Sequence, residues 1–508
     1  MSNAPAPSSP SAPLKLFNSL TRQLEEFQPV HPGEARVYSC GPTVYNYPHI
    51  GNMRAYVFAD ILGRTLSFKG YKLTHVINIT DVGHLTDDAD EGEDKMEKMA
   101  RAEARSIWDI AQHYTQAYWE DIKALNIRQP ARWTIATEYV PQMIAFAEKI
   151  ADKHCYELDS GLYFDVSTVA DYGRLARAQT EDGEGRIEAV EGKRNAADFA
   201  IWRKTPPGEK RQMEWDSPWG KGAPGWHLEC SVMSGEVLGF PFDIHTGGID
   251  HREIHHPNEI AQNQAFCCAG GLDLPANSGA RVWMHNNFLV ERSGKMSKSS
   301  GEFLRLQLLM DKGYHPLAYR MMCLQAHYRS ELEFSWEGLG AALTRLKRMY
   351  KVVAVQMWKQ FEETGQPVDP TNAYLPIPVD KWNAADKTGV LKDFSDALSD
   401  DLNTPKCLPL IEEVLGDKMI DNALRWHLLA TMDQVLGLDL LRRNRTDLRI
   451  RPKSVEITEA EIEATLEARK AARAEKDFAR SDTLRDELAA KGVEVMDGDP
   501  LGWEWKLA

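Results

Sequence analysis

The chain has 508 residues, of which 43% are hydrophobic and 27% charged, and its formal net charge is −15. One hydrophobic core supports roughly 250–300 residues, so we expect several domains. No run approaches the ~18 apolar residues that a membrane span needs, which excludes a membrane-embedded protein. The acidic balance alone favours a metabolic enzyme with small substrates over a nucleic-acid-binding protein.

The N-terminal residues 1–15 are rich in Pro, Ala and Ser and contain no cation before Lys15. We expect a disordered tail here rather than a secretory or transit peptide. The seven cysteines include no CxxC pair. An odd number without paired spacing favours free thiols in a reducing compartment, so the sequence predicts a cytoplasmic location.

The first predicted elements form one α/β unit. Residues 36–40 are typical of a short buried strand, residues 53–68 carry apolar side chains at helical spacing, and residues 73–79 predict a second strand. Strand, loop, helix and strand in this order indicate a Rossmann-type parallel sheet, in which ligands bind at the carboxyl ends of the strands. We place this catalytic domain at 16–330, with a lysine-bearing loop region at about 288–330.

An insertion is expected inside that domain at about 86–220. The composition turns strongly acidic after Thr86, and residues 155–225 mix short strand signals with Gly- and Glu-rich turns. Residues 242–248 then predict a return to the main sheet.

The remainder of the chain is predicted to be mostly helical. Residues 331–445 indicate a helical bundle with a break at 366–380. Residues 446–508 indicate a linker followed by a small mixed α/β module that ends in a strand–turn–strand. Between Arg442 and Lys453 the sequence has six cations and one acid. This segment either follows a phosphate backbone or is a solvated linker.

Two loops carry residues suited to phosphate chemistry. His49-Ile50-Gly51-Asn52 stands before the first helix, where backbone N–H groups favour phosphate, although a helix cap would explain it equally. Lys295 and Lys298 lie in a loop flanked by glycines, and two mobile ammonium groups there could follow the charge on a departing pyrophosphate. A lysine loop that is merely solvent-exposed is the alternative.

These two motifs in this order resemble the signatures of class I aminoacyl-tRNA synthetases. Seven segments resemble the cysteinyl-tRNA synthetase family in particular: CGPTVYNYPHIGN (40–52), NITD (78–81), PGWHLECSVMS (224–234), FDIHTGGID (242–250), HHPNEIAQ (255–262), KMSKSSGEF (295–303) and KDFARSDTLRDEL (476–488). The resemblance runs from about residue 16 to the end. It implies activation of L-cysteine by ATP with Mg²⁺, followed by transfer to tRNA(Cys), and we expect a monomer.

The resemblance also implies one zinc site, with four ligands: Cys40, Cys230, His255 and Glu259. From spacing alone, two cysteines so far apart are interpreted as small core residues. Pro257 predicts a helix that begins near it, which leaves His256 as an alternative to His255. Zinc binds a thiolate well and a neutral hydroxyl poorly, so it would separate cysteine from serine without proofreading.

The remaining family positions are assigned by the same resemblance. Catalysis is assigned to His49, Asn52, Lys295 and Lys298; ATP binding to these residues with Gly51, Gly247, Gly248 and Asp250; cysteine binding to Gly41, Thr43, Trp226 and His245; and anticodon recognition to Arg473, Phe478, Asp482 and Asp497. An aromatic side chain that stacks on a base, with Arg and Asp reading base edges, suits a single-stranded loop. Without the resemblance, these residues could equally be turn, core or helix-surface positions.

The sequence departs from the family pattern at a few places. Asn52 replaces a second histidine but keeps a donor, HHPNE replaces the commoner HHENE, and the acidic residues 82–95 have no assigned role. One rival is a ligase of the same fold that joins cysteine to an amino sugar in thiol-cofactor synthesis, which would need no anticodon module. Another is a non-catalytic tRNA-binding paralogue, which would lose ligands or lysines.

Overall fold

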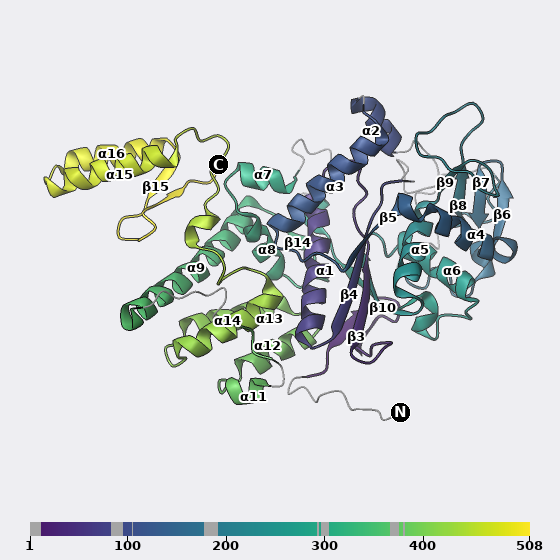
Figure 1. The fold of residues 1–508 in the computed structure, drawn as a ribbon, viewed down its shortest axis with the longest axis horizontal. Coiled ribbons are helices and arrows are strands. Elements are labelled where there is room, and N and C mark those ends of the chain that lie inside the picture. The colour runs from purple at the N-terminus through teal and green to yellow at the C-terminus, as the bar shows by residue number, and fades with distance from the viewer. Residues whose placement is uncertain are drawn as a thin grey trace.

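The computed structural model describes residues 12–82, 95–103, 105–176, 192–291, 294–295, 304–365, 375–378 and 381–508. Figure 1 shows a parallel sheet between two layers of helices, a helical bundle beside it, and a C-terminal module at the end of the molecule farthest from a second, smaller sheet. None of the helices in these ranges is long and apolar enough to cross a membrane.

The central sheet has five strands in the order β11-β10-β3-β4-β5, and every neighbouring pair is parallel. Its strands are β3 (Glu34–Ser39), β4 (Lys72–Ile79), β5 (Arg132–Ile135), β10 (Phe242–Gly248) and β11 (Ala280–Asn286). The Rossmann-type sheet predicted from the sequence is therefore confirmed.

Alternate residues of each strand pack on opposite faces of this sheet. Val37 belongs to a core cluster with Phe58 and Leu62 of α1 (Ile50–Phe68), whereas its neighbour Tyr38 belongs to a cluster with Leu228 of α5 (Trp226–Leu238). Because successive side chains of a strand point to opposite faces, a sheet covered on both sides needs apolar residues at nearly every position. The carboxyl-terminal halves of β3, β4 and β10 are almost entirely buried, so a ligand reaches these strands at their ends.

The predicted insertion contains one strand of the main sheet. β5 pairs with β4 in parallel, although its residues fall inside the expected insertion of about 86–220. The rest of this region adds α2 (Lys95–Glu103), α3 (Ile107–Ala124), α4 (Val140–His154) and an antiparallel sheet of β6 (Cys155–Leu158), β7 (Gly161–Phe164), β8 (Phe199–Lys204) and β9 (Gly222–Pro224). The chain therefore leaves the central sheet twice: between β4 and β5, and again between β5 and β10.

The elements after β10 lead into the bundle. They are α6 (His255–Cys267), β12 (Leu289–Glu291), β13 (Gly294–Lys295), α7 (Leu306–Asp311), α8 (Pro316–Leu324), β14 (Leu332–Glu333), α9 (Trp336–Thr364), α11 (Trp382–Ala385), α12 (Val390–Ser399), α13 (Thr404–Gly416) and α14 (Asn422–Leu436). At the other end of the chain, β1 (Lys15–Asn18) and β2 (Gln23–Glu26) form an N-terminal hairpin. This hairpin touches both domains, since Phe17 N donates to Asp401 Oδ1 at 2.8 Å and Ser19 N to Trp283 O at 2.8 Å.

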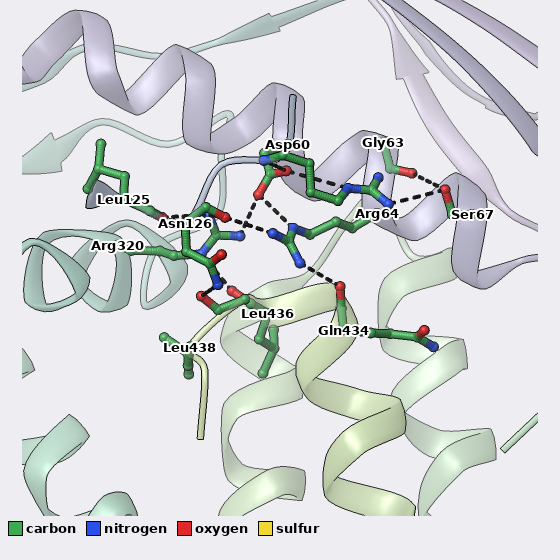
Figure 2. Close-up of polar contacts among 12 residues, drawn as sticks. Asp60, Gly63, Arg64, Ser67, Leu125, Asn126, Arg320, Gln434, Leu436 and Leu438 are labelled. Carbon is green, nitrogen blue, oxygen red and sulfur yellow. Dashed lines mark hydrogen bonds and ion pairs between the residues drawn. The ribbon is translucent and has the colours of Figure 1, made fainter. Parts of the chain in front are cut away.

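A buried charge cluster joins the catalytic domain to the bundle (Figure 2). Asp60 of α1 accepts hydrogen bonds from Arg64 Nε and from Arg320 Nη2 of α8, each at 2.7 Å. The two guanidinium groups also donate to carbonyls at the C-terminal end of α14, Arg64 to Gln434 O and Arg320 to Leu436 O. Cations at a helix C-terminus are favourable, so this cluster fixes α14 against α1.

The C-terminal module consists of α15 (Glu459–Ala474), α16 (Phe478–Ala490), β15 (Val493–Val495) and β16 (Trp503–Trp505), with the two strands antiparallel. The basic segment that precedes it has partners within the chain: Arg443 Nε lies 2.9 Å from Asp439 Oδ2, and the Arg449 guanidinium lies 4.0 Å from the ring centroid of Trp503. Arg443 nevertheless keeps 35% of its side chain exposed, and Arg442, Arg451 and Lys453 are exposed, so both interpretations of this segment stay predictions.

Candidate active site

A cavity of about 420 Å³ opens at the carboxyl ends of β3 and β10. Its lining includes Cys40 and Gly41, which follow β3, Gly248 and Asp250 at the end of β10, and His49 at the start of α1. This is the edge of the sheet where the sequence predicts the ligands.

Four predicted zinc ligands come together beside this cavity, and two of them, Cys40 and His255, line it. Cys40, Cys230, His255 and Glu259 are buried, and one donor atom from each lies within 4.8 Å of the others. His255 and Glu259 share a face of α6, with 3.0 Å between His255 Nε2 and Glu259 Oε1. α6 begins at His255, earlier than the predicted start near Pro257, and Pro257 lies in its first turn.

The charges at this cluster suit a divalent cation. A hydrogen bond from Cys40 lowers the pKa of Cys230 to about 6, so that sulfur is a thiolate at neutral pH. Burial opposes ionisation of Glu259, yet His245 and His255 lower the pKa of its carboxyl to about 2. Glu259 Oε1 is buried, and its contact at 3.0 Å with His255 Nε2 does not have hydrogen-bond geometry. Two anionic donors close to a histidine nitrogen and a second sulfur fit a bound Zn²⁺.

His256 also lies close to the cluster. Cys40, His245, His256 and Glu259 form a second set whose donor atoms lie within 4.8 Å of one another. His256 Nε2 is 3.3 Å from Cys40 Sγ, while its Nδ1 is 2.7 Å from His285 Nε2. The other histidine, His255, has its Nδ1 2.9 Å from His227 Nδ1. Each ring therefore has one nitrogen near the donors and the other held by a second histidine.

The tetrapeptide His49–Asn52 caps α1 and also borders the cavity. His49 Nδ1 accepts a hydrogen bond from Gly51 N at 3.1 Å, and Asn52 Oδ1 accepts one from His49 N at 3.1 Å. His49, Gly51 and Asn52 all line the cavity. The cap and the proposed phosphate site thus use the same residues, and the two interpretations are compatible.

The predicted cysteine-binding residues separate into two groups. Gly41, Thr43 and Trp226 line the cavity, and the Trp226 ring stacks on His255 with centroids 4.3 Å apart. His245 lies behind the donors instead, fully buried, with its Nε2 2.9 Å from Glu259 Oε2. It therefore touches a predicted metal ligand rather than the cavity.

The predicted nucleotide-binding glycines have different surroundings. Gly248 and Asp250 line the cavity, whereas a Cβ on Gly247 would lie 2.6 Å from His256 Cε1. Gly247 is required because His256 packs against it, a reason that the sequence does not reveal. The side chains of Lys295 and Lys298 lie outside the described residues, although the Lys295 backbone pairs with Val290 in the β12–β13 hairpin.

The predicted anticodon residues lie on the C-terminal module. Arg473 Nη1 is 3.3 Å from Asp497 Oδ1, the Phe478 ring is 61% exposed, and Asp482 lies one turn further along α16 from Phe478. Asp497 also receives two hydrogen bonds from Arg469, at 2.6 and 2.7 Å.

Sequence reasoning missed several residues that shape these sites. Arg469 is one, because nothing in a helix sequence indicates a partner in a distant loop. Asn78 is another: its Oδ1 accepts from Gly41 N at 2.7 Å, and a Cβ on Gly41 would lie 1.6 Å from Asn78 O. The NITD segment, residues 78–81, begins with Asn78, so this motif could have identified Asn78 as part of the site.

Two family models match the chain. The tRNA synthetases class I (C) catalytic domain matches residues 26–344, and the Cysteinyl-tRNA ligase anticodon binding domain matches residues 458–500. A cysteine–tRNA ligase of Novosphingobium aromaticivorans is 81% identical over 506 residues, covering 100% of this chain and 99% of the relative. One from Zymomonas mobilis is 54% identical, covering 98% of each chain. This chain belongs to the cysteine–tRNA ligase family.

More distant cysteine–tRNA ligases also align along the whole chain. The protein of Treponema denticola is 42% identical, covering 95% of this chain and 98% of the relative. The resemblance noted from the sequence motifs is therefore confirmed, and the chain is an aminoacyl-tRNA ligase.

Solved structures of other class I synthetases share the fold of this ligase. A methionyl-tRNA synthetase of Mycobacterium tuberculosis has a TM-score of 0.50 at 15% identity, covering 84% of this chain and 97% of that one. The agnB2 LeuRS of Agrobacterium radiobacter K84, in a ternary complex, has a TM-score of 0.55 at 11% identity, covering 93% and 95%.

Proposed function

We propose that this ligase selects L-cysteine through a zinc ion held by Cys40, Cys230, His255 and Glu259. The single observation that carries the proposal is the buried cluster of these four donors beside the cavity, which Cys40 and His255 line. The thiolate of Cys230 and the ionised Glu259 would hold the ion, which in turn would ligate the substrate sulfur as a thiolate. We favour His255 over His256 because only its donor set includes Cys230.

Selection through sulfur explains why a proofreading site is unnecessary. A hydrophobic pocket alone separates near-isosteric substrates by only ~10²-fold, whereas a site whose main bond the wrong substrate cannot make reaches about 10⁴. Trp226, which stacks on His255 and lines the cavity, would pack against the small amino acid.

We propose that His49 and Asn52 bind the phosphates of ATP, which enters with Mg²⁺. His49 Nδ1 accepts a hydrogen bond and so carries no proton, which leaves the proton on Nε2 as a donor. Asn52 uses Oδ1 in the cap, so its amide NH₂ is also a donor. The cap thereby orients two donors for the α-phosphate while the cysteine carboxylate attacks it and pyrophosphate leaves. Lys295 and Lys298 would balance the charge on that pyrophosphate.

In the second step a ribose hydroxyl of tRNA(Cys) takes the cysteinyl group, with the anticodon bound by Arg473, Phe478, Asp482 and Asp497. The exposed Phe478 ring supports base stacking. The match of residues 458–500 to an anticodon binding domain disfavours the thiol-cofactor ligase, which needs no such module. Action as a monomer in the cytoplasm stays a prediction from the sequence.

Isotopic pyrophosphate exchange into ATP, combined with metal analysis, tests the zinc proposal. We expect exchange that depends on cysteine, with serine at least about 10⁴-fold poorer in kcat/KM. Cys230→Ser should lose both bound zinc and exchange, since it removes a thiolate ligand. Cys155→Ser, which changes a free cysteine of β6 away from the cluster, should keep both.

Two results would contradict the proposal. One is a Cys230→Ser protein that retains stoichiometric zinc and cysteine-dependent exchange. The other is wild-type exchange that survives complete removal of zinc or that serine supports as well as cysteine.

A further inference from the structure

The basic segment before the C-terminal module joins that module to the bundle. Asp499, in the loop between β15 and β16, accepts hydrogen bonds from Arg445 Nη1 of the basic segment at 2.6 Å and from Lys351 Nζ of α9 at 2.8 Å. We call these three residues the clasp. They come from three separate parts of the chain, so the contact closes only when the module is docked.

The burial and the charge of Asp499 and Arg445 favour a stable ion pair in the clasp. The side chains of Asp499 and Arg445 are only 8% and 14% exposed. The hydrogen bond from Arg445 holds the pKa of Asp499 well below its ordinary value, so the carboxylate stays ionised. A second ion pair lies beside it, between Lys347 Nζ of α9 and Glu504 Oε2 of β16 at 2.7 Å. Charge-assisted hydrogen bonds in such partly buried geometry are stronger than exposed ion pairs.

The module also contacts the segment that follows the lysine loop. Lys453 N donates to Asp311 O at 2.8 Å, and Ala508 N donates to Lys312 O at 3.0 Å. At the next residue, a Cβ on Gly313 would lie 3.0 Å from Pro452 Cγ. These contacts meet the C-terminal end of α7. The module is therefore fastened both to α9 and to the chain that leads out of the catalytic domain.

We propose that Asp499 is a positioning residue for the transfer of cysteine to tRNA. The clasp fixes the distance between the anticodon residues on the module and the catalytic cavity. A tRNA held at its anticodon then presents its acceptor end to the cavity at a high effective concentration. The inference rests on the proposed function, because it assigns tRNA to the module and adenylate to the cavity.

Steady-state kinetics of the full-length Asp499→Asn protein test this role. The substitution keeps the side-chain shape but removes the charge that binds Arg445 and Lys351. We expect kcat for tRNA charging to fall roughly tenfold while KM for tRNA stays within about twofold, since recognition is kept and delivery is lost. Cysteine-dependent pyrophosphate exchange should match the wild type. Glu467→Gln, at an exposed pair with Lys470 on α15 of the same module, is the matched control and should change neither step.

Lys351→Met removes a partner of the clasp from the bundle side and provides a second measurement if Asp499→Asn folds poorly. It should lower kcat for charging in the same direction, again without loss of exchange. Charging at the wild-type kcat in both variants would overturn the proposal, and so would a raised KM with kcat unchanged, which would indicate tRNA recognition. Absence of cysteine-dependent exchange in the wild type would instead refute the proposed function.

Discussion

His75 shows how burial changes the chemistry of a single residue near the site. It lies in β4 with its Nε2 2.8 Å from Ser39 Oγ. Burial lowers its pKa to about 4; Asp60 raises this pKa by a smaller amount, and Arg128 lowers it further. The ordinary pKa of histidine is about 6.5. In the folded chain this imidazole is therefore neutral at every pH where the enzyme would work.

This shift predicts a loss of stability in acid. The folded-state pKa is depressed, so the contribution of His75 is fully present above pH ~6.5 and declines as pH falls toward 4, because only the unfolded chain takes up the proton. The loss amounts to about 2 kcal/mol at pH 5. We expect the melting temperature of the wild type to fall more between pH 7.5 and 5 than that of His75→Gln. Equal falls in differential scanning calorimetry would contradict this prediction.

The sequence motifs assigned candidate site residues, but they could not give the surroundings of those residues. Gly247 was assigned to nucleotide binding, yet His256 occupies the space where its Cβ would be. His245 was assigned to the substrate, yet it contacts Glu259. In both cases the partner is a histidine or carboxylate from another element. Such pairings depend on how β10 and α6 pack, which no local sequence pattern encodes.

At the scale of elements, the buried cluster of Asp60, Arg64 and Arg320 links α1 to α14 (Figure 2). Burial opposes ionisation of Asp60, but Arg320 and Arg64 lower the pKa of its carboxyl. One carboxylate thus balances guanidinium groups that also cap α14. Removing its charge would leave buried cations without a counter-ion.

Asp60→Asn should therefore destabilise the chain strongly. Breaking a buried ion pair from one side typically costs about 3–5 kcal/mol, against roughly 0–1 for a surface pair. Glu412→Gln is the control, because Glu412 also binds an arginine, Arg345, but is 40% exposed. Thermal melting should show a large decrease for Asp60→Asn and little change for Glu412→Gln. Similar small shifts in both would show that the cluster does not hold the domains together.

Three strands of the central sheet were predicted from the sequence, whereas β5 and the seven-residue β11 were not. The strands β3, β4 and β10 were found because both faces of the sheet are buried and their apolar runs are nearly continuous. β5 has only four residues, RWTI, and follows a helical stretch, so it was included in the insertion. The start of α6 was also misjudged, since Pro257 is tolerated within a first turn.

At the scale of the whole molecule, the proposed sites of adenylation and of tRNA recognition lie in different parts of the fold. The cavity opens at the central sheet, while the predicted anticodon residues lie on a module at the far side of the bundle (Figure 1). Variants of the module should therefore spare the first reaction and impair the second.

Arg473→Ala should raise KM for tRNA by about tenfold, because a hydrogen bond from a charged group is worth about 1.5–3 kcal/mol. Pyrophosphate exchange should stay at the wild-type rate. Lys470→Ala removes a cation that is 78% exposed on the same helix and controls for the loss of charge alone. If both variants raise KM equally, Arg473 acts through general electrostatics and not through a base contact.

The order of the domains could be predicted from the sequence, but the contacts that hold them together could not. Apolar periodicity separated the α/β domain, the bundle and the terminal module. The sequence of the basic segment, however, shows only that it is positively charged. The carboxylate that binds Arg445 of this segment belongs to Asp499, which lies in a distant loop. The predicted zinc ligands likewise come from the residue after β3, from α5 and from α6, and could be grouped only by resemblance to a family.

The N-terminal hairpin sets a practical limit on how the gene can be shortened. Ser19 Oγ is 2.9 Å from His285 Nδ1, which begins a relay of side chains through His256 to Cys40. A deletion through residue 19 would remove the hydrogen bond from Phe17 N to Asp401 of the bundle and leave His285, the first histidine of that relay, without its contact to Ser19. Ala12 N already donates to Asp396 Oδ1 at 2.8 Å and Leu14 is buried, so truncations should keep the chain from Ala12 onward.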